Sequence, residues 1–175
     1  IDGNYISFIK NKPCVIVSYL EGSKLKNVSR NDCYQVGDIL SSFHINASDF
    51  KQERNNGMGY SQWENIFLKC KNSSNKYYQN IFSLINDELI FLKKNWPTDL
   101  PKGIIHADVF QDNVFFKNNK ISGLIDFYFS CNDYLSYDIA ITINAWCFSD
   151  KAKIKVNNLL SLIKGYEKNR FLKME

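Results

Sequence analysis

The sequence predicts an α+β fold that is mostly helical. Short runs of β-branched and aromatic residues occur near the N-terminus and again after residue 103, and stretches with the apolar period of amphipathic helices lie between and after them. Hydrophobic residues make up 45% of the 175 residues, which is enough apolar material for the core of one domain. We therefore expect one folded domain rather than a disordered chain.

The first predicted element is a β-hairpin. Residues 5–9 form a β-type run, residues 10–13 indicate a turn, and residues 14–20 form a second and more apolar strand. The sequence Glu21-Gly22-Ser23 then interrupts the pattern, so the second strand should end at residue 20.

Three helices are predicted next. The first begins at a cap supplied by Ser29 or Asn31, because apolar residues recur at helical spacing beyond that point. The polar residues 46–59 predict a loop, a short helix follows around residues 63–70, and a longer amphipathic helix runs from about residue 78 to 92. The apolar positions of that longer helix are Tyr78, Ile81, Phe82, Ile85, Leu89 and Leu92.

Short strands return after residue 103. Apolar runs at residues 104–105, 114–116 and 121–125 predict three strands, and a tight turn joins the last two. Two further helices are expected over residues 135–148 and 151–168.

The last of these helices should begin at a cap supplied by Ser149 or Asp150. Its apolar residues recur at a spacing that places them on one face, so we expect that face to be buried. The residues of that face are Ile154, Leu159, Leu160, Ile163 and Tyr166.

Composition excludes several classes of partner. The net charge is only +4, and the 22 basic residues are scattered, so no nucleic-acid partner is expected. Five cysteines without a C-x-x-C pair and only two histidines argue against structural zinc and indicate reduced thiols. No apolar run approaches the roughly 20 residues that span a bilayer and no signal peptide is visible, so we expect a cytoplasmic protein without a membrane partner.

Polar residues that can carry out chemistry lie between the short strands. His106, Asp108 and Asn113 follow the first of these strands, and Asp126 follows the third. Their types and spacing match the kinase pattern H-x-D-x-x-x-x-N followed by a further acidic residue. Phosphoryl transfer needs a carboxylate that orients the attacking hydroxyl and accepts its proton, and it needs hard oxygen ligands for Mg²⁺. These residues therefore predict a kinase active site.

Several of these polar residues also have a structural interpretation. Asp108 alone would suit a turn or a helix cap, although its context favours catalysis. We expect the ring of His106 to bond the backbone and hold the loop, and we expect Asp138 to brace the loop from behind. Asp112 is interpreted as a solvated neighbour, and Asp133 as a helix cap.

The aromatic run Phe127-Tyr128-Phe129 follows Asp126 directly. Aromatic residues in such a position are more often part of the core than of a cofactor site. Tyr128 and Phe129 nevertheless remain candidates for contact with the acceptor substrate.

Longer strings of sequence then identify a resemblance. Residues 106–116, 121–129, 137–140 and 144–148 resemble the core of the aminoglycoside-phosphotransferase-like superfamily, and within it the bacterial homoserine kinases. The strings Ile-Asp-Phe-Tyr-Phe and Asn-Ala-Trp-Cys-Phe are the narrower part of this resemblance. It implies a protein-kinase-like C-terminal lobe in which the small β-hairpin region carries the catalytic residues.

The resemblance also implies roles for individual residues. Asp108 matches the catalytic base, and Asn113 and Asp126 match the ligands of Mg²⁺. Residues 18–21, which are Ser18, Tyr19, Leu20 and Glu21, match the hinge whose backbone meets the adenine of ATP. The implied acceptor is L-homoserine and the implied product is O-phospho-L-homoserine, an intermediate of threonine biosynthesis. Choline, another small alcohol or an aminoglycoside is the alternative acceptor.

The sequence departs from the family pattern at its N-terminal end. Kinases of this fold use a glycine-rich phosphate loop, a lysine and a helix glutamate from the N-terminal lobe, and none of them precedes the hairpin. We therefore expect a fragment, with residues 1–22 as the last strands of the N-terminal lobe and the hinge, and residues 23–175 as the helical lobe with its catalytic loop at 106–126.

As a fragment, the chain is expected to be impaired or inactive alone, and a non-catalytic kinase remnant is the competing interpretation. Apolar surface left without its lobe should favour association.

Overall fold

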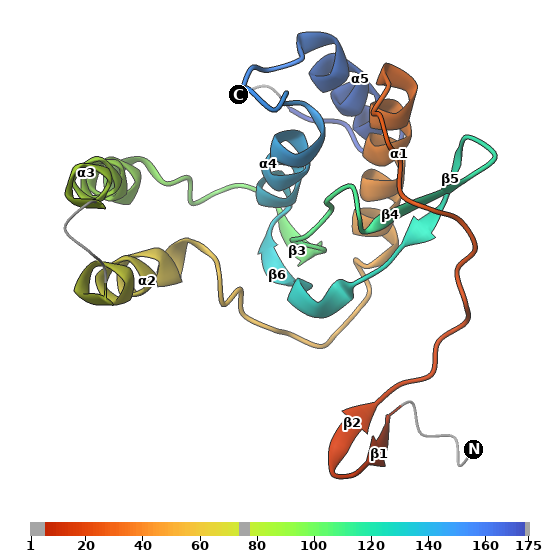
Figure 1. The fold of residues 1–175 in the computed structure, drawn as a ribbon, viewed down its shortest axis with the longest axis horizontal. Helices are drawn as coiled ribbons and strands as arrows, with labels where there is room; N and C mark the ends of the chain where they lie inside the picture. The colour runs from red at the N-terminus through yellow and green to blue at the C-terminus, as the bar shows by residue number, and fades with distance from the viewer. Residues whose placement is uncertain (1–5, 74–77, 174–175) are drawn as a thin grey trace.

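The computed structural model describes residues 6–73 and 78–173. Helices α1, α4 and α5 and two small sheets form the main body, while α2 and α3 lie together on one side of it (Figure 1). A long extended segment connects this body to a separate β-hairpin near the N-terminus. The architecture is α+β and mostly helical, as the sequence predicts.

The N-terminal hairpin is shorter than predicted. Strand β1 (Ser7–Ile9) pairs antiparallel with β2 (Lys12–Cys14), and the turn residues Lys10 and Asn11 have positive φ angles of 49° and 60°. The prediction of a strand over residues 14–20 is wrong beyond Cys14. Residues 15–20 pair with no strand among the described residues, and a strand needs a neighbour to satisfy its backbone.

Helix α1 (Arg30–Asn46) begins at Ser29 because a capping box forms there. The Ser29 Oγ accepts a hydrogen bond from the backbone N–H of Asp32, and an Asp32 carboxylate oxygen accepts one from the Ser29 N–H at 2.9 Å. Of the two predicted caps, Ser29 is therefore right and Asn31 is wrong.

Helix α5 (Val156–Glu167) packs along α1 at very short range. A Cβ atom on Gly37 would lie 2.0 Å from the carbonyl oxygen of Leu162, and one on Gly165 would lie 1.9 Å from that of Tyr34. Both positions require glycine because the backbones of the two helices touch there.

The predicted start of α5 is wrong. Residues 149–153 form a turn in which the Ala152 N–H donates to the Ser149 carbonyl oxygen, so the helix begins only at Val156, with Lys155 as its N-cap. The predicted buried face is also partly wrong, because Leu160 is 61% exposed whereas Leu162 is fully buried.

Two antiparallel sheets frame the loop that carries Asp108. Strand β3 (Lys102–Ile105) pairs with β6 (Cys131–Tyr134), and β4 (Val114–Lys117) pairs with β5 (Lys120–Leu124). A short 3-10 helix, η2 (Phe127–Phe129), follows Asp126.

Strand β6 was not predicted, and its residue Asp133 is not a helix cap. The N-cap of α4 (Leu135–Trp146) is Tyr134, and no side-chain bond caps it. Instead, Asp133 accepts hydrogen bonds from the Tyr134 N–H and from the amide nitrogen of Asn56, both at 2.7 Å.

The main core lies between α1, α4, α5 and the β4–β5 hairpin. Its buried members come from all of these elements and from the loop before β4, so the core anchors that loop through Val109. They are Cys33, Val36, Leu40, Val109, Val114, Phe116, Ile139, Trp146, Cys147, Leu162 and Tyr166.

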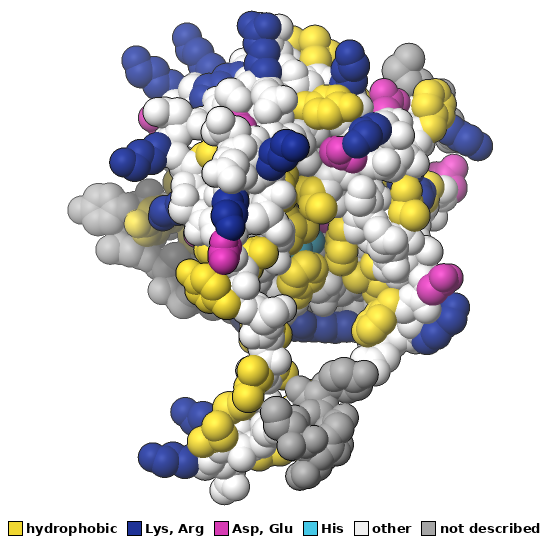
Figure 2. All heavy atoms as spheres, turned by 90° about the vertical axis from the view of Figure 1, so that its right-hand side faces the viewer, with side chains coloured by type: hydrophobic (Ala, Val, Ile, Leu, Met, Phe, Trp, Pro, Cys, Tyr) yellow, Lys and Arg dark blue, Asp and Glu magenta, His cyan; other side chains and the backbone are white. Residues whose placement is uncertain are grey.

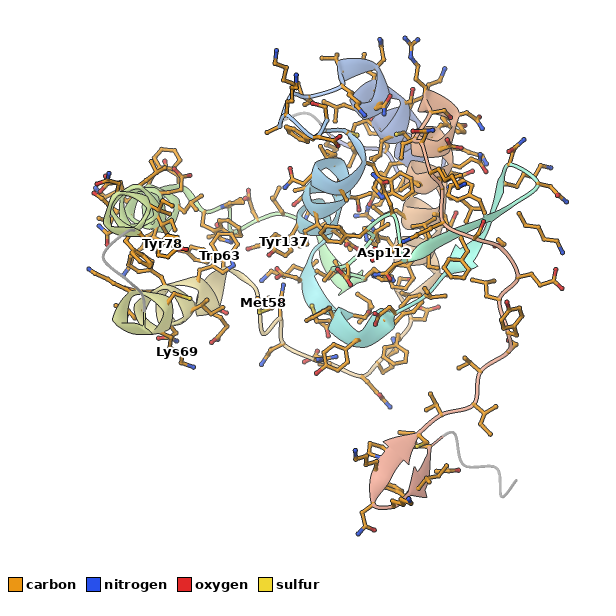
Figure 3. All side chains as sticks on the ribbon, in the orientation of Figure 1. Met58, Trp63, Lys69, Tyr78, Asp112 and Tyr137 are labelled. Atoms are coloured by element: carbon orange, nitrogen blue, oxygen red, sulfur yellow. The ribbon has the colours of Figure 1, made fainter. Side chains whose placement is uncertain are left out.

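Helices α2 (Tyr60–Ser73) and α3 (Gln79–Asn95) meet the body through aromatic side chains. Tyr60 stacks on Trp96 at 4.4 Å between ring centroids, and Trp63 lies 6.3 Å from the ring of Tyr137 on α4 (Figure 3). The predicted apolar face of α3 is largely exposed, for example at Ile81. Within the described residues, no helix combines the length and the apolar character needed to cross a membrane.

Candidate active site

Asp108 and Asn113 lie together in the loop between β3 and β4. The Asn113 amide nitrogen donates to the backbone oxygen and to a carboxylate oxygen of Asp108, both at 2.9 Å. Inside the loop, the Phe110 N–H donates to the Asp108 carbonyl at 2.8 Å and the Asn113 N–H donates to the Phe110 carbonyl at 3.0 Å. The loop is therefore a closed turn that fixes the two side chains against each other.

Asp126 approaches the same place from the end of β5. Its backbone is left-handed, with φ of 62°, and its side chain is exposed. The preceding residue, Ile125, donates its N–H to the Asn113 carbonyl at 3.0 Å. The structure thus brings together the three residues that the sequence pattern singled out, Asp108, Asn113 and Asp126.

Electrostatics supports this proximity. Burial raises the pKa of the Asp108 carboxyl, the hydrogen bond from Asn113 opposes the rise, and the negative charges of Asp126 and Asp112 add to it. Asp108 is therefore a partly buried carboxylate with other carboxylates nearby, which is a setting that favours a bound cation.

His106 connects the two halves of the site. Its ring is fully buried, and its Nε2 lies 3.1 Å from the carbonyl oxygen of Ile125. Because a carbonyl only accepts, Nε2 must carry the proton, and Nδ1 has no hydrogen-bond partner in the described part of the chain. The ring also packs on Phe127 at 4.5 Å between centroids. This geometry is the backbone bond expected of His106, and it ties Asp126 to the loop of Asp108.

Asp138 on α4 holds the start of the same loop. Its two carboxylate oxygens accept the backbone N–H groups of His106 and Ala107 at 2.7 and 2.9 Å. The Nε2 of His44 lies 3.0 Å from the same carboxylate, and Tyr166 lies 2.8 Å from the other ring nitrogen of His44. Ala107 has a φ of 62°, so these bonds hold a backbone conformation that a residue with a side chain rarely adopts.

The four expected hinge residues behave differently from one another. The Leu20 side chain lies over Gly123 of β5, and Glu21 forms an ion pair with Lys117 of β4. Ser18 and Tyr19 have exposed side chains. Seen from the side, hydrophobic side chains follow this connecting segment between hairpin and body (Figure 2).

A cavity of about 190 Å³ opens beside Asp108. Larger cavities elsewhere contain none of Asp108, Asn113 and Asp126, so the chemistry of its wall distinguishes this one. Its lining residues are Asn56, Met58, Ala107, Asp108, Phe129, Tyr137 and Ile141.

The loop side of this cavity is fixed by hydrogen bonds. The Met58 N–H donates to the Asn56 side-chain oxygen at 2.9 Å, and the Met58 carbonyl accepts from the indole of Trp63 at 2.8 Å and from the Tyr137 hydroxyl at 3.5 Å. Figure 3 shows Met58, Trp63 and Tyr137 between the α2–α3 pair and the body. The loop residues Asn56 and Met58, which line this cavity together with Asp108, are therefore held in place by hydrogen bonds.

Comparison with known proteins places this geometry in a family. The sequence pattern of the Phosphotransferase enzyme family matches residues 4–172. The chain belongs to this family. Curated relatives of this phosphotransferase chain include the homoserine kinases of Rhizobium meliloti (strain 1021), 37% identical over 99% of this chain, and of Bartonella tribocorum, 39% identical over 97% of this chain. The chain spans about half the length of these relatives, 53% in both cases.

Solved structures share the fold of this phosphotransferase chain. An amicoumacin kinase, hAmiN, in complex with AMP-PNP, Ca²⁺ and Ami matches 98% of this chain and 55% of its own, with a TM-score of 0.72 and 15% identity. An aminoglycoside-3'-phosphotransferase of type VIII matches 90% of this chain and 62% of its own, with a TM-score of 0.68 and 14% identity. The predicted protein-kinase-like fold is confirmed.

The donor set of the candidate site fits a hard cation only in part. The described residues contain no group of three or more His, Cys, Asp or Glu side chains that could hold a metal ion alone. Asn113 uses its amide nitrogen on Asp108, so its amide oxygen is the group left for a ligand. Together with the exposed carboxylate of Asp126 it supplies two oxygens, and Mg²⁺ commonly takes one or two protein carboxylates with substrate phosphates and water for the rest.

Several residues around the candidate site could not be found from the sequence. His44, which contacts Asp138, and Tyr166, which contacts His44, gave no motif signal. Asn56 and Met58 lie in the segment interpreted only as a polar loop. A polar loop placed before aromatic residues carries no local signal of a pocket, because its partners on α4 are distant in sequence.

Proposed function

We propose that the protein is an ATP-dependent kinase that transfers the γ-phosphoryl group to the hydroxyl of L-homoserine, giving O-phospho-L-homoserine. The observation that carries this proposal is the convergence of Asp108, Asn113 and Asp126 beside a cavity that Asp108 itself lines. The naming of the curated relatives as homoserine kinases supports the choice of acceptor.

In this proposal Asp108 is the catalytic base. An acceptor hydroxyl in the cavity would donate its hydrogen bond to the carboxylate, so its oxygen is oriented for attack on the γ-phosphorus, and its proton passes to Asp108. One Asp108 oxygen is held by Asn113, which fixes the orientation of the carboxylate. Burial raises the pKa of Asp108, which makes it a stronger proton acceptor than an exposed aspartate.

The Asn113 amide oxygen and the Asp126 carboxylate are the proposed ligands of Mg²⁺. A bound Mg²⁺ ion would offset the charge of the ATP phosphates during transfer. Asp126 meets this requirement from an exposed position on a left-handed backbone, and Ile125 anchors it through bonds to both Asn113 and His106.

ATP would lie between this site and the N-terminal segment. Ser18, Tyr19, Leu20 and Glu21 are the proposed adenine-contacting residues, with residues 1–22 as part of the nucleotide-binding lobe and 23–175 as the catalytic lobe. The contacts of Leu20 and Glu21 with the β4–β5 hairpin, next to Asn113, support this location.

The size of the cavity supports a small acceptor. Pockets that bury drug-sized ligands measure roughly 300–1,000 Å³, whereas this cavity measures about 190 Å³. A four-carbon hydroxy amino acid such as L-homoserine suits that space better than an aminoglycoside. Choline has a similar size, so it remains the acceptor against which homoserine must be compared.

The test is isothermal titration of this chain with ATP, with and without Mg²⁺, followed by L-homoserine or choline. We expect magnesium-dependent nucleotide binding that Asp126→Ala abolishes, and homoserine binding that choline does not match. Folded chain that binds neither nucleotide nor homoserine would instead support a non-catalytic kinase remnant. Stronger binding of choline would move the proposal to a different acceptor.

A further inference from the structure

The loop of Asp108 is held by α4 at a second place, at the end of that helix opposite Asp138. The indole Nε1 of Trp146 donates a hydrogen bond to the Val109 carbonyl at 2.8 Å. The Gln111 amide nitrogen donates to the Ala145 carbonyl at 2.9 Å. Both loop residues lie between Asp108 and Asn113 in the sequence, so this contact acts on the segment that connects them.

Trp146 is itself held firmly. Its side chain is 1% exposed, and its carbonyl accepts from the amide of Asn158 on α5 at 3.5 Å and from the Cys33 thiol on α1 at 3.8 Å. Three helices therefore fix the residue whose indole reaches the loop. A donor fixed in this way determines where the Val109 carbonyl lies.

The chemistry of the loop explains why such a donor matters. Val109 is fully buried, and a buried carbonyl without a donor costs free energy. Asp138 fixes the backbone before Asp108, at His106 and Ala107, but it makes no bond after Asp108. With only the first contact, α4 would hold this closed turn at one end, so residues 109–111 could move relative to the helix and the distance between the Asp108 carboxylate and the Asn113 amide would be less well fixed.

We propose that Trp146 and Gln111 are positioning residues that hold the Asp108 carboxylate against the Asn113 amide and so set the rate of phosphoryl transfer. The kinetic half of this inference rests on the proposed function. The geometric half does not, because it concerns only the loop of this chain.

Hydrogen exchange of this chain tests the geometric half without any need for turnover. In Trp146→Phe and in Gln111→Met we expect the amides of Phe110 and Asn113, which close the loop, to exchange about fivefold faster relative to the rest of the molecule, as for the loss of one hydrogen bond. Leu162→Val is the matched control, because Leu162 lies in the same core cluster but its aliphatic side chain cannot form a hydrogen bond with the loop. Uniformly faster exchange in Trp146→Phe, as in Leu162→Val, would overturn the proposal.

Steady-state kinetics with Mg-ATP and L-homoserine test the other half. We expect kcat to fall about tenfold in either variant while both KM values hold, and the double variant to lose less than the product of the two, since both bonds hold one loop. An unchanged kcat, corrected for the folded fraction, would overturn the positioning role. Selective loop exchange in the two variants, combined with a wild-type chain that shows no turnover, would support the geometric half and count against the proposed activity of this chain alone.

Discussion

Asp108, the proposed catalytic base, lowers the stability of the folded chain at neutral pH. Burial raises the pKa of its carboxyl above the ordinary value of 3.8, so the folded chain binds this proton more tightly than the unfolded chain does. The unfolded chain therefore loses its proton first as pH rises, and this group makes folding less favourable as pH rises above 3.8. At neutral pH the charge on Asp108 is thus destabilising.

Asp108→Asn should separate stability from activity. We expect turnover to fall about 10²–10⁴-fold, as for loss of a general base, while the free energy of unfolding at pH 7 stays equal to that of the wild type or rises. The gain should disappear below pH 3.8, where the Asp108 carboxyl is protonated in both states. Denaturant unfolding at pH 7 and pH 3 measures this, with the exposed Asp112→Asn as the control. A variant that is clearly less stable than Asp112→Asn at pH 7 would contradict the argument.

Removing the carboxylate of Asp138 should lower stability, because both of its oxygens accept hydrogen bonds in the folded chain. Asp138→Ala leaves two loop N–H groups and the buried His44 without their acceptor. We expect urea denaturation to show a loss of about 3–5 kcal/mol in the free energy of unfolding, because each buried donor left without an acceptor costs about 1–3 kcal/mol. His44→Gln leaves both backbone bonds in place, so it should cost less. Equal losses would mean that the backbone bonds contribute nothing.

The three residues of the site could be predicted because their spacing is local. Asp108 and Asn113 share one loop, and Asp126 follows on the next hairpin, so a short pattern contains all three. The residues that hold them could not be predicted in this way. His44 lies 94 residues from Asp138 and 122 residues from Tyr166, and only the folded chain brings them together.

At the scale of the elements, helix propensity alone predicts the wrong direction for the effect of Gly→Ala substitutions where α1 meets α5. Glycine inside a helix is usually about 1 kcal/mol less favourable than alanine, so Gly37→Ala or Gly165→Ala would ordinarily stabilise the protein. Here the added Cβ would lie about 2 Å from a carbonyl oxygen of the partner helix. The helices must separate, and packed cores resist such expansion.

We therefore expect Gly37→Ala and Gly165→Ala each to lower the free energy of unfolding by roughly 1–3 kcal/mol or more. Gly57→Ala is the control, because a Cβ there meets nothing within 4 Å. Thermal melts of the three variants give the comparison. A melting temperature for Gly37→Ala at or above that of the wild type would show that the helices have room to part.

Elements with a strong local signal could be predicted, and elements defined by a distant partner could not. The capping box at Ser29 and the turn between β4 and β5 are each formed by residues that are close together in the sequence. Strand β6 has the sequence Cys-Asn-Asp-Tyr, which has little β-character, and it forms because β3 pairs with it. Conversely, residues 15–20 have strong β-character but find no partner within the described chain.

At the scale of the molecule, the connecting segment before α1 carries the most exposed apolar side chains among the described residues. Ile16 is 92% exposed, Val17 79% and Tyr19 88%. Residues 15–20 take part in no strand pairing among the described residues (Figure 1). The association expected from such surface stays a prediction.

Limited proteolysis should cut this segment first. We expect chymotrypsin to cleave after Tyr19 and to leave the part from Leu20 onward folded, because exposed backbone without hydrogen bonds is the preferred site of cleavage. Mass spectrometry of the early products identifies the cut, and the buried Tyr134 and Tyr166 serve as internal controls. Early cleavage at either of these would mean that the body opens as readily as the segment.

Helix α4 carries both Asp138 and Trp146, which hold the loop of Asp108, and this has a consequence for how the protein can evolve. Asp138 and Trp146 lie eight residues apart on one helix, which corresponds to about 12 Å of rise. The helix therefore sets a fixed distance between its two contacts with the loop. One residue inserted between them would turn one contact about 100° away from the other. Substitutions between Asp138 and Trp146 therefore leave this spacing intact, whereas a change in the length of α4 removes one end of the loop from its support.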